Sequence, residues 1–195
     1  MSSASEGPLG FVLDTAILAR LGALQSRDET TFRHSLAVAE LLAAFARHLG
    51  LDAACVELLR LSGLLHDIGK VELNLSVLDK PGHLTANEMA HVRSHPARGH
   101  RFLLQVGGMP DVVLDICRHH HERLDGAGYP DGLTGNQISQ AVRMATICNV
   151  HEALISPRQY KPGWSPQDTP TWMQQAEGFF DPGLLGQFLY LVTKQ

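Results

Sequence analysis

The chain has 195 residues, of which 44% are hydrophobic and 18% are charged, and its formal net charge is −4 at pH 7. This length suffices for one well-cored domain and is too short for two ordinary ones. The small negative charge gives no electrostatic reason to expect binding to a nucleic-acid polymer or to a membrane surface.

The chain is expected to begin with a flexible leader at residues 1–8, followed by one domain at residues 9–195. Apolar residues recur at helical spacing, and glycine, proline and capping residues separate the periodic stretches. The expected helices cover residues 9–14 to about 24, 31–49, 53–67, 85–106 with a break at His95-Pro96, 110–120, 139–157, and a last helix from Asp181-Pro182. Residues 160–180 are expected to form loop with short helical turns, and no useful stretch alternates as a strand does. The sequence therefore predicts an all-α fold, a single-domain helical bundle.

A histidine, an aspartate and a lysine, His66, Asp67 and Lys70, follow an almost wholly apolar run. Neighbouring residues on a helix point about 100° apart, which suits two metal ions side by side. The imidazole of His66 can bind one ion while the carboxylate of Asp67 bridges both. Lys70 lies one helical turn further on, within reach of an anion held by the metals.

Four other histidines are expected to point into the same core. His34 and His120 lie on apolar helix faces, the proline after His95 turns that residue inward, and His121 follows His120. Each alone fits a core histidine with a satisfied ring, but so many buried polar groups are costly to satisfy together without a metal. We therefore interpret the set as a binuclear centre for two divalent ions, and a set without cysteine suits Fe, Mn, Ni, Co or Zn. Three further histidines are expected to be solvated: His83, His91 and His100.

Cysteine usage and the N-terminus bear on the compartment. The cysteines are widely spaced and lack the CxxC pattern, which argues against a disulfide framework and for a reducing compartment. We assign Cys117 and Cys148 to packing. No run approaches the roughly 18 apolar residues of a membrane span, and residues 1–8 have no basic segment of the secretory type. A cytoplasmic protein is expected.

Several separate motifs over residues 25–188 together resemble the HD-GYP family, a branch of the HD-domain metal-dependent phosphohydrolases. The motifs are His34, His66-Asp67-Ile68-Gly69-Lys70, Lys80-Pro81-Gly82, Leu84-Thr85 with Glu88, His95-Pro96 with Gly99, His120-His121-Glu122 and Asp125-Gly126-Ala127-Gly128-Tyr129-Pro130. The resemblance implies a helical bundle of the HD-domain type with a centre of two or three metals. It also implies hydrolysis of cyclic di-GMP, a bacterial second messenger, to linear pGpG or to GMP.

The resemblance further implies roles for individual residues. The metal ligands would be His34, His66, Asp67, His95, His120 and His121. Lys70 would contact the scissile phosphate, and Arg158 and Lys161 would hold the dianionic substrate; without the resemblance, these two cations would be read as part of a solvated loop. Glycines near Tyr129 allow a tight loop with exposed backbone amides that can border a ligand. Tyr129 would then stack near a base, or the Gly128-Tyr129-Pro130 loop would be the surface for a protein partner.

Two positions depart from the family pattern. Where the family has a sequence resembling Asp-Val-Phe-Asp-Ala-Leu, this chain reads Asn149-Val150-His151-Glu152-Ala153-Leu154. The Asn149 amide can coordinate but carries no charge, so the site lacks one negative charge, and His151 is expected to point to another side of its helix. Members with three metals carry a glutamate where this chain has Thr30, so two metals at most are expected.

The mechanism that these expectations define is metal-assisted attack of water on a phosphodiester, with Lys70 neutralising charge on the phosphoryl oxygens and no side-chain nucleophile. The leading hypothesis is a cyclic di-GMP phosphodiesterase, weakened by Asn149. The second is a module that binds cyclic di-GMP or a protein partner without hydrolysis. The third is an HD phosphohydrolase acting on another nucleotide.

Overall fold

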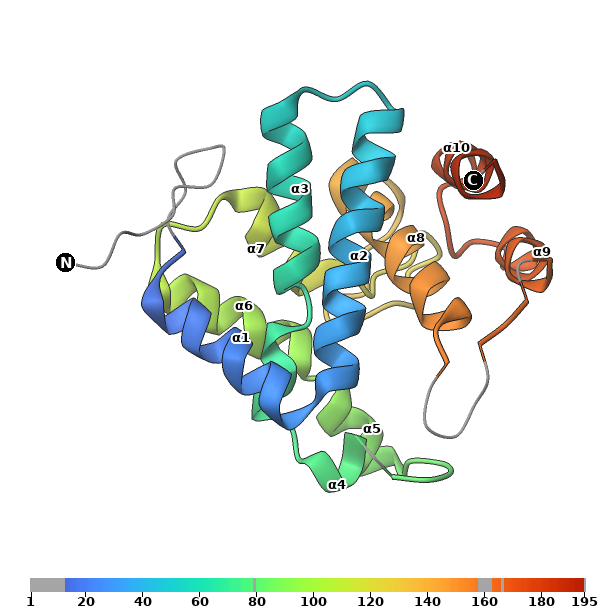
Figure 1. Cartoon of the computed structure of the whole chain (residues 1–195). Coiled ribbons are helices and arrows are strands. Elements are labelled where there is room, and N and C mark those ends of the chain that lie inside the picture. Colours follow the sequence, from blue (N-terminus) through green and yellow to red (C-terminus); the bar gives the residue numbers. More distant parts are fainter. Residues whose placement is uncertain (1–12, 79, 158–162, 166, 195) are drawn as a thin grey trace.

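The computed structural model describes residues 13–78, 80–157, 163–165 and 167–194, and within them the chain is all-α, as expected (Figure 1). The helices are α1 Thr15–Arg27, α2 Glu29–His48, α3 Ala53–Leu65, α4 Leu75–Leu78, α5 Ala86–Val92, α6 His95–Val106, α7 Asp111–His119, α8 Gln140–Ile155, α9 Asp168–Gln175 and α10 Pro182–Thr193, with 3₁₀ turns η1 Ile68–Glu72 and η2 Gly135–Gln137. These described residues form one isolated β-bridge, between Asp125 and Thr134, and no strand. None of their helices is both long and apolar enough to cross a membrane. The expected leader at residues 1–8 and the expected domain start at residue 9 lie outside the described residues.

Short polar side chains start most of the long helices. The N-cap oxygen accepts a hydrogen bond from an N–H of the first turn, which otherwise has no helical partner. These caps are Asp14, Asp28, Asp52, Ser139 and Asp181. The capping box expected at Thr85 and Glu88 is present at the start of α5.

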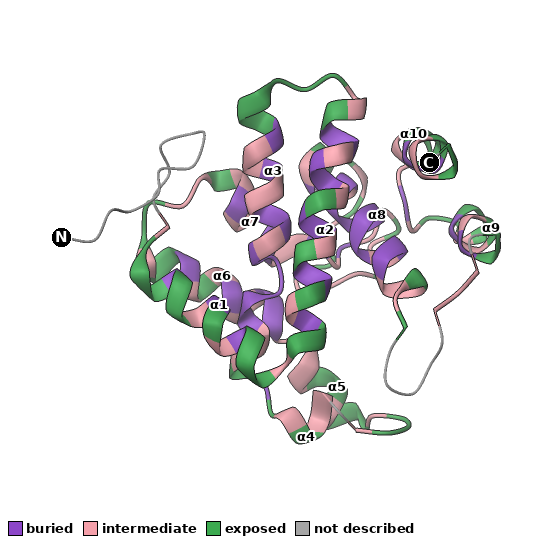
Figure 2. Cartoon of the chain, viewed as in Figure 1, coloured by how far each residue is buried: buried purple, intermediate pink, exposed green. Residues whose placement is uncertain are grey.

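Helices α2 and α3 lie side by side at the centre of the molecule (Figure 1). Gly63 in α3 allows this approach, because a Cβ there would lie 2.7 Å from Ala39 Cα in α2. One apolar cluster joins α2 and α3 to α8 and α10, where Phe45 and Phe188 meet edge to face. A second cluster joins α1 to η1, α6 and α7. Figure 2 shows α8 buried over most of its length, whereas α1 and α10 have exposed outer faces.

Several helix boundaries differ from the sequence expectation. The helix expected to reach Asp67 ends at Leu65, and the chain turns into η1. The first helix continues to Arg27 rather than ending near residue 24, because Asp28 closes α1 through its N–H and opens α2 through its side chain. Neither α4 nor the eight-residue α9 was expected as a separate helix.

Candidate metal centre

Asp67 lies where two sets of candidate metal ligands meet. One set joins Asp67 with His95, His120 and His121, and the other joins it with His34 and His66. Within each set, one ligand atom from every residue lies within 4.8 Å of the others. The fold thus brings together six of the expected ligands, from α2, α6 and the ends of α3 and α7, and Asp67 is common to both sets. Asn149, the seventh expected ligand, lies beside His34.

Three of the histidines are oriented by backbone carbonyl groups at helix ends. The Nδ1–H of His66 donates to Gly63 O at 2.7 Å, that of His95 to Val92 O at 2.8 Å, and that of His120 to Ile116 O at 3.1 Å. Carbonyls in the last turn of a helix often lack a helical partner and accept such bonds readily, although Ile116 O also accepts the backbone N–H of His120. With Nδ1 protonated, each ring presents the lone pair of Nε2 as a ligand.

The Nε2 atoms of the same histidines converge on Asp67. His95 Nε2 lies 3.1 Å from Asp67 Oδ1, and His66 Nε2 lies 3.3 Å from Asp67 Oδ2. His95 Nε2 and His120 Nε2 are 3.2 Å apart. Nitrogen lone pairs facing each other at this distance repel unless a proton or a cation lies between them. The arrangement therefore fits a metal centre.

Two buried atoms of this cluster have no hydrogen-bond partner among the described residues: His66 Nε2 and Asp67 Oδ1. Asp67 and His66 are each 1% exposed. A buried polar atom without a partner is destabilising and calls for a specific explanation. Both atoms are electron-pair donors that face the centre of the cluster, so a divalent cation fits the site.

Electrostatics favour the protonation states that metal ligands need. Burial alone raises the pKa of Asp67, but the Lys70 ammonium and His66 outweigh it and hold that pKa well below its usual range. Burial, followed by the neighbouring imidazoles, lowers the pKa of His120 and His121 well below the usual value. Burial also lowers the pKa of His95. The carboxylate is thus charged and these imidazoles neutral at pH 7.

His34 is held by side chains rather than by backbone. Its Nε2 lies 2.8 Å from Asn149 Oδ1 and 3.8 Å from Asp67 Oδ2. Its Nδ1 bonds the carboxylate of Glu152, which is 4% exposed. Sequence reasoning did not select Glu152, although its position three residues after Asn149 indicates that both side chains share one face of α8.

A cavity of about 310 Å³ opens beside His34 and Lys70. It is lined by α2, by Lys70 and by the end of α8: Thr30, Thr31, Arg33, His34, Ala37, Lys70, Glu152, Ser156 and Pro157. Lys70 was expected to reach an anion; here its Nζ donates to Asp67 Oδ2 at 2.6 Å, from a position between the ligand cluster and the cavity. The expected substrate contacts Arg158 and Lys161 lie outside the described residues.

The Gly-Tyr-Pro loop packs against the other side of the cluster. The Tyr129 ring stacks on His121, with centroids 4.7 Å apart, and the Arg93 guanidinium lies 5.2 Å from the Tyr129 ring centre. The expectation of exposed amides in the loop at residues 125–132 is wrong for most of them. The amides of Asp131 and Gly132, and that of Leu133 just after the loop, donate to the buried carboxylate of Glu122. Most of the remaining loop amides donate to backbone carbonyls or to an aspartate side chain. Sequence reasoning gave Glu122 no role beyond its motif, and its role here is to fold the loop.

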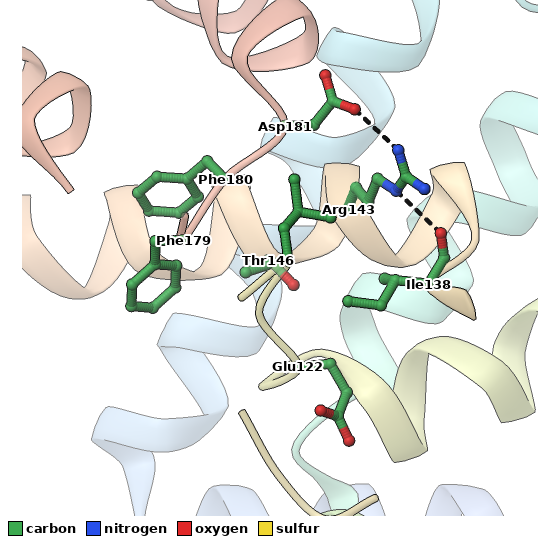
Figure 3. A pocket seen from close by; sticks show the side chains of 8 residues that line it. Glu122, Ile138, Arg143, Thr146, Phe179, Phe180 and Asp181 are labelled. Carbon is green, nitrogen blue, oxygen red and sulfur yellow. Dashed lines mark hydrogen bonds and ion pairs between the residues drawn. The ribbon is translucent and has the colours of Figure 1, made fainter. Parts of the chain in front are cut away.

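Glu122 also borders a small cavity of about 10 Å³, which Thr146 and Phe180 line as well (Figure 3). There Arg143 donates to Asp181 and to the carbonyl oxygen of Ile138 (Figure 3). These contacts join the start of α8 to the start of α10. The small cavity is therefore part of the scaffold.

The remaining histidines and cysteines lie in other environments. Cys117 and Cys148 are buried, as expected for packing. The His151 ring contacts Phe188 with centroids 5.0 Å apart, on another side of α8 from Asn149. The expectation of solvated histidines holds for His83 alone of the three, because His91 and His100 are half-buried. His91 Nε2 accepts the Asn74 N–H at 3.3 Å.

Comparisons with known proteins agree with this architecture. The sequence model of a family described as HD domain matches residues 17–184. A cyclic di-GMP phosphodiesterase of Pseudomonas aeruginosa, PA4108, is 44% identical over 87% of this chain and 41% of that protein. The 3'3'-cGAMP-specific phosphodiesterase 1 of Vibrio cholerae is 39% identical over 71% of this chain and 32% of that protein. The chain thus spans less than half the length of either curated relative.

A solved structure shares the fold. Bd1817, an HDG"Y"P protein from Bdellovibrio bacteriovorus, superposes with a TM-score of 0.70 over 85% of this chain and 53% of its own, at 23% identity. At this identity the likeness concerns the fold alone.

Proposed function

The chain belongs to the HD domain family, in its HD-GYP branch, and from that premise we propose that it is a metal-dependent phosphodiesterase that hydrolyses cyclic di-GMP to linear pGpG or to GMP. The observation that carries the proposal is the position of Asp67, a buried carboxylate shared by two sets of histidines. The relative named a cyclic di-GMP phosphodiesterase supports the choice of substrate.

We assign a divalent ion to each ligand set. His95, His120 and His121 would hold one ion, His34, His66 and the neutral Asn149 the other, and Asp67 both. Nitrogen and oxygen donors without cysteine suit Fe, Mn, Ni, Co or Zn. When bound, such ions supply Lewis acidity toward a phosphodiester and lower the pKa of water.

The chain's own residues would orient the substrate and stabilise charge. Lys70 lies at the edge of the cavity, so exchanging its bond to Asp67 for one to a phosphoryl oxygen requires only a side-chain movement. The stacked pair of Tyr129 and His121 offers an aromatic surface beside the same centre, and we assign Tyr129 to base stacking. Arg158 and Lys161 are retained as proposed contacts that hold the dianionic substrate. Free thiols at Cys117 and Cys148 suit a reducing compartment, so we propose that the protein acts in the cytoplasm.

Hydrolysis by the reconstituted protein tests this function. The purified chain is stripped of metal, reloaded separately with Mn, Fe or Ni, and incubated with cyclic di-GMP, and the products are separated by ion-exchange chromatography. Metal-dependent formation of pGpG or GMP is expected, and none is expected from the metal-free protein. Absence of turnover with every metal would contradict the proposal.

A second candidate function follows from Asn149, which lies beside the ligand set of His34, His66 and Asp67 and brings no charge to it. A protein that cannot hold both ions would bind cyclic di-GMP, or a protein partner through the Gly128-Tyr129-Pro130 loop, without hydrolysis. The Asn149→Asp variant separates the two functions. A gain of activity from an inactive parent would support the binding module, whereas activity in the parent itself supports the enzyme.

A third candidate is hydrolysis of another cyclic dinucleotide, favoured by the similarity to the 3'3'-cGAMP-specific phosphodiesterase. A panel of cyclic di-GMP, 3'3'-cGAMP and cyclic di-AMP under the same conditions distinguishes the substrates. Preference for cyclic di-GMP should fall when Arg158 or Lys161 is replaced by alanine; if neither matters, their assignment is wrong.

A further inference from the structure

Helix α8 presents two side chains to opposite nitrogens of the His34 ring. Asn149 Oδ1 lies 2.8 Å from Nε2, and the Glu152 carboxylate bonds Nδ1. The two residues are three positions apart, so they lie one above the other on the same face of the helix. Both are buried, Asn149 at 6% and Glu152 at 4% exposure. The His34 ring therefore lies between an amide and a carboxylate from one helix.

This support differs from that of the other candidate ligands. His66, His95 and His120 each donate Nδ1–H to a neutral backbone carbonyl. A charged acceptor binds an N–H more strongly than a neutral one and makes the opposite nitrogen more basic. His34 is thus expected to donate electrons to a metal more strongly than the other three histidines. It lies beside Asn149, whose neutral amide donates less than a carboxylate would.

The two lone pairs on this side also converge. When Nδ1–H of His34 donates to Glu152, Nε2 carries a lone pair and not a proton. Asn149 Oδ1, also a lone-pair atom, lies 2.8 Å from it. Two acceptors this close repel unless a proton or a shared cation lies between them. The contact to Glu152 is therefore compatible with His34 and Asn149 acting together on a metal.

The charges at positions 149 and 152 distinguish this chain from the family pattern. The family pattern has an aspartate at both, whereas this chain has the uncharged Asn149 at the first and a glutamate, one methylene longer, at the second. A buried carboxylate is costly unless hydrogen bonds or opposite charge compensate it. Glu152 has such bonds, from His34 and from the Ser156 hydroxyl.

We propose that Glu152 is a positioning residue that acts on the metal through His34, as the one carboxylate left on this face of α8 where Asn149 brings no charge. The inference rests on the proposed metal centre and deepens it. It gives a reason why a chain with an amide ligand would hold two ions.

A double-mutant cycle tests the inference with metal alone. The four proteins are the wild type, Glu152→Gln, Asn149→Asp, and the variant with both changes. Each is stripped, titrated with Mn²⁺ and measured by elemental analysis after dialysis and by the Mn²⁺-induced rise in Tm. Glu152→Gln should weaken one of two Mn²⁺ sites by about 10- to 100-fold, the usual effect of removing an outer carboxylate. The double variant should regain most of that affinity, because the Asn149→Asp change restores the charge.

Two results would overturn the inference. One is Glu152→Gln binding Mn²⁺ like the wild type. The other is the double variant being as weak as Glu152→Gln, which would mean that Glu152 serves packing rather than charge. If Glu152→Gln does not fold, as judged by circular dichroism, Glu152→Ala, which also removes the charge, takes its place in the cycle.

Glu88→Gln is the matched control, because it makes the same chemical change in α5, where Glu88 binds Lys80 and not a candidate ligand. Its Mn²⁺ affinity should be unchanged. Since no nucleotide is used, failure to hydrolyse cyclic di-GMP leaves this test readable. A wild-type chain that binds none of Mn²⁺, Fe²⁺ and Ni²⁺ contradicts both proposals, whereas equal binding by the wild type and Glu152→Gln contradicts this one alone.

Discussion

The two sides of Asp67 are built differently. On one side, His95 and His120 are 1% and 0% exposed and are oriented by backbone carbonyls at helix ends. On the other, His66 is also oriented by a backbone carbonyl, but His34 is 8% exposed, borders a cavity, and is held by the side chains of Asn149 and Glu152. A backbone-held ligand is fixed by the fold, whereas a side-chain-held ligand changes with one substitution. The departure at Asn149 falls on the side that can accommodate it.

The largest effect is expected from Asp67→Asn, because this residue is common to both sides. An amide cannot supply the bridging charge, so both ions should be lost together. Any phosphodiesterase activity should fall by at least about 100-fold. Elemental analysis and hydrolysis assays measure the two effects. A variant that retains one ion at full occupancy would contradict the role of Asp67 as a ligand of both ions.

Replacing one histidine on each side sharpens the comparison. His34→Gln should remove the ion held by His34 and His66 and leave about one ion per chain. The other set, in which Asp67 joins His95, His120 and His121, stays intact. His120→Gln should leave less metal than His34→Gln, because His120 belongs to the more rigid set. Elemental analysis of both variants, prepared in parallel, checks the order; the reverse order would contradict it.

A substitution at Gly69 tests how close packing of η1 against α6 holds His95 in place. A Cβ at Gly69 would overlap the carbonyl oxygen of His95, so Gly69→Ala should push α6 away and destabilise the protein by about 1–3 kcal/mol. Gly22→Ala is the control, because a Cβ at Gly22 meets nothing within 4 Å in α1. It should be neutral or stabilising by up to about 1 kcal/mol. Urea unfolding of the two variants should therefore give changes of opposite sign or clearly different size.

The last prediction concerns the pH dependence of the metal-free protein. Burial lowers the pKa of His95, His120 and His121 in the folded state, so in mildly acidic solution the unfolded chain binds more protons than the folded one. Their contribution to stability is complete above the unfolded pKa near 6.5 and declines as pH falls below it, by at most about 1.4 kcal/mol per pH unit for each histidine.

His119 acts in the opposite direction. Burial would lower its pKa, but hydrogen bonds to Asp115 and Asp131 raise it, so its contribution is complete below the unfolded pKa and declines as pH rises. Burial also lowers the pKa of His100 and His151, so five histidines act in one direction and one in the other. The Tm of the metal-free chain should therefore fall between about pH 7.5 and about pH 5.5. A flat or rising Tm over this range would show that the buried imidazoles are not held neutral.

Much of the ligand set could be predicted from the sequence. Helical spacing put His34 and His120 on apolar faces, and the proline after His95 marked a helix start, where the structure begins α6. These signals are local, because they depend on the periodicity and chain geometry of single elements. They identified six residues that the fold brings to one centre.

What could not be predicted depends on contacts between elements. The position of Lys70 was predicted by assuming that the helix continues through Asp67. In the structure the 3₁₀ turn η1 follows Asp67, and the Lys70 ammonium donates a hydrogen bond to the Asp67 carboxylate. Glu152 and Glu122 were not selected because their partners, His34 on α2 and the amides of the Gly-Tyr-Pro loop, lie on other segments. A buried carboxylate is recognisable from sequence spacing, but its partner is not.

Anomalous diffraction from crystals of the Mn-loaded protein would locate the ions relative to Asp67. Two Mn peaks are expected with Asp67 between them, one among His95, His120 and His121, the other beside His34 and His66. A single peak, or peaks that do not share Asp67, would contradict a centre bridged by this carboxylate.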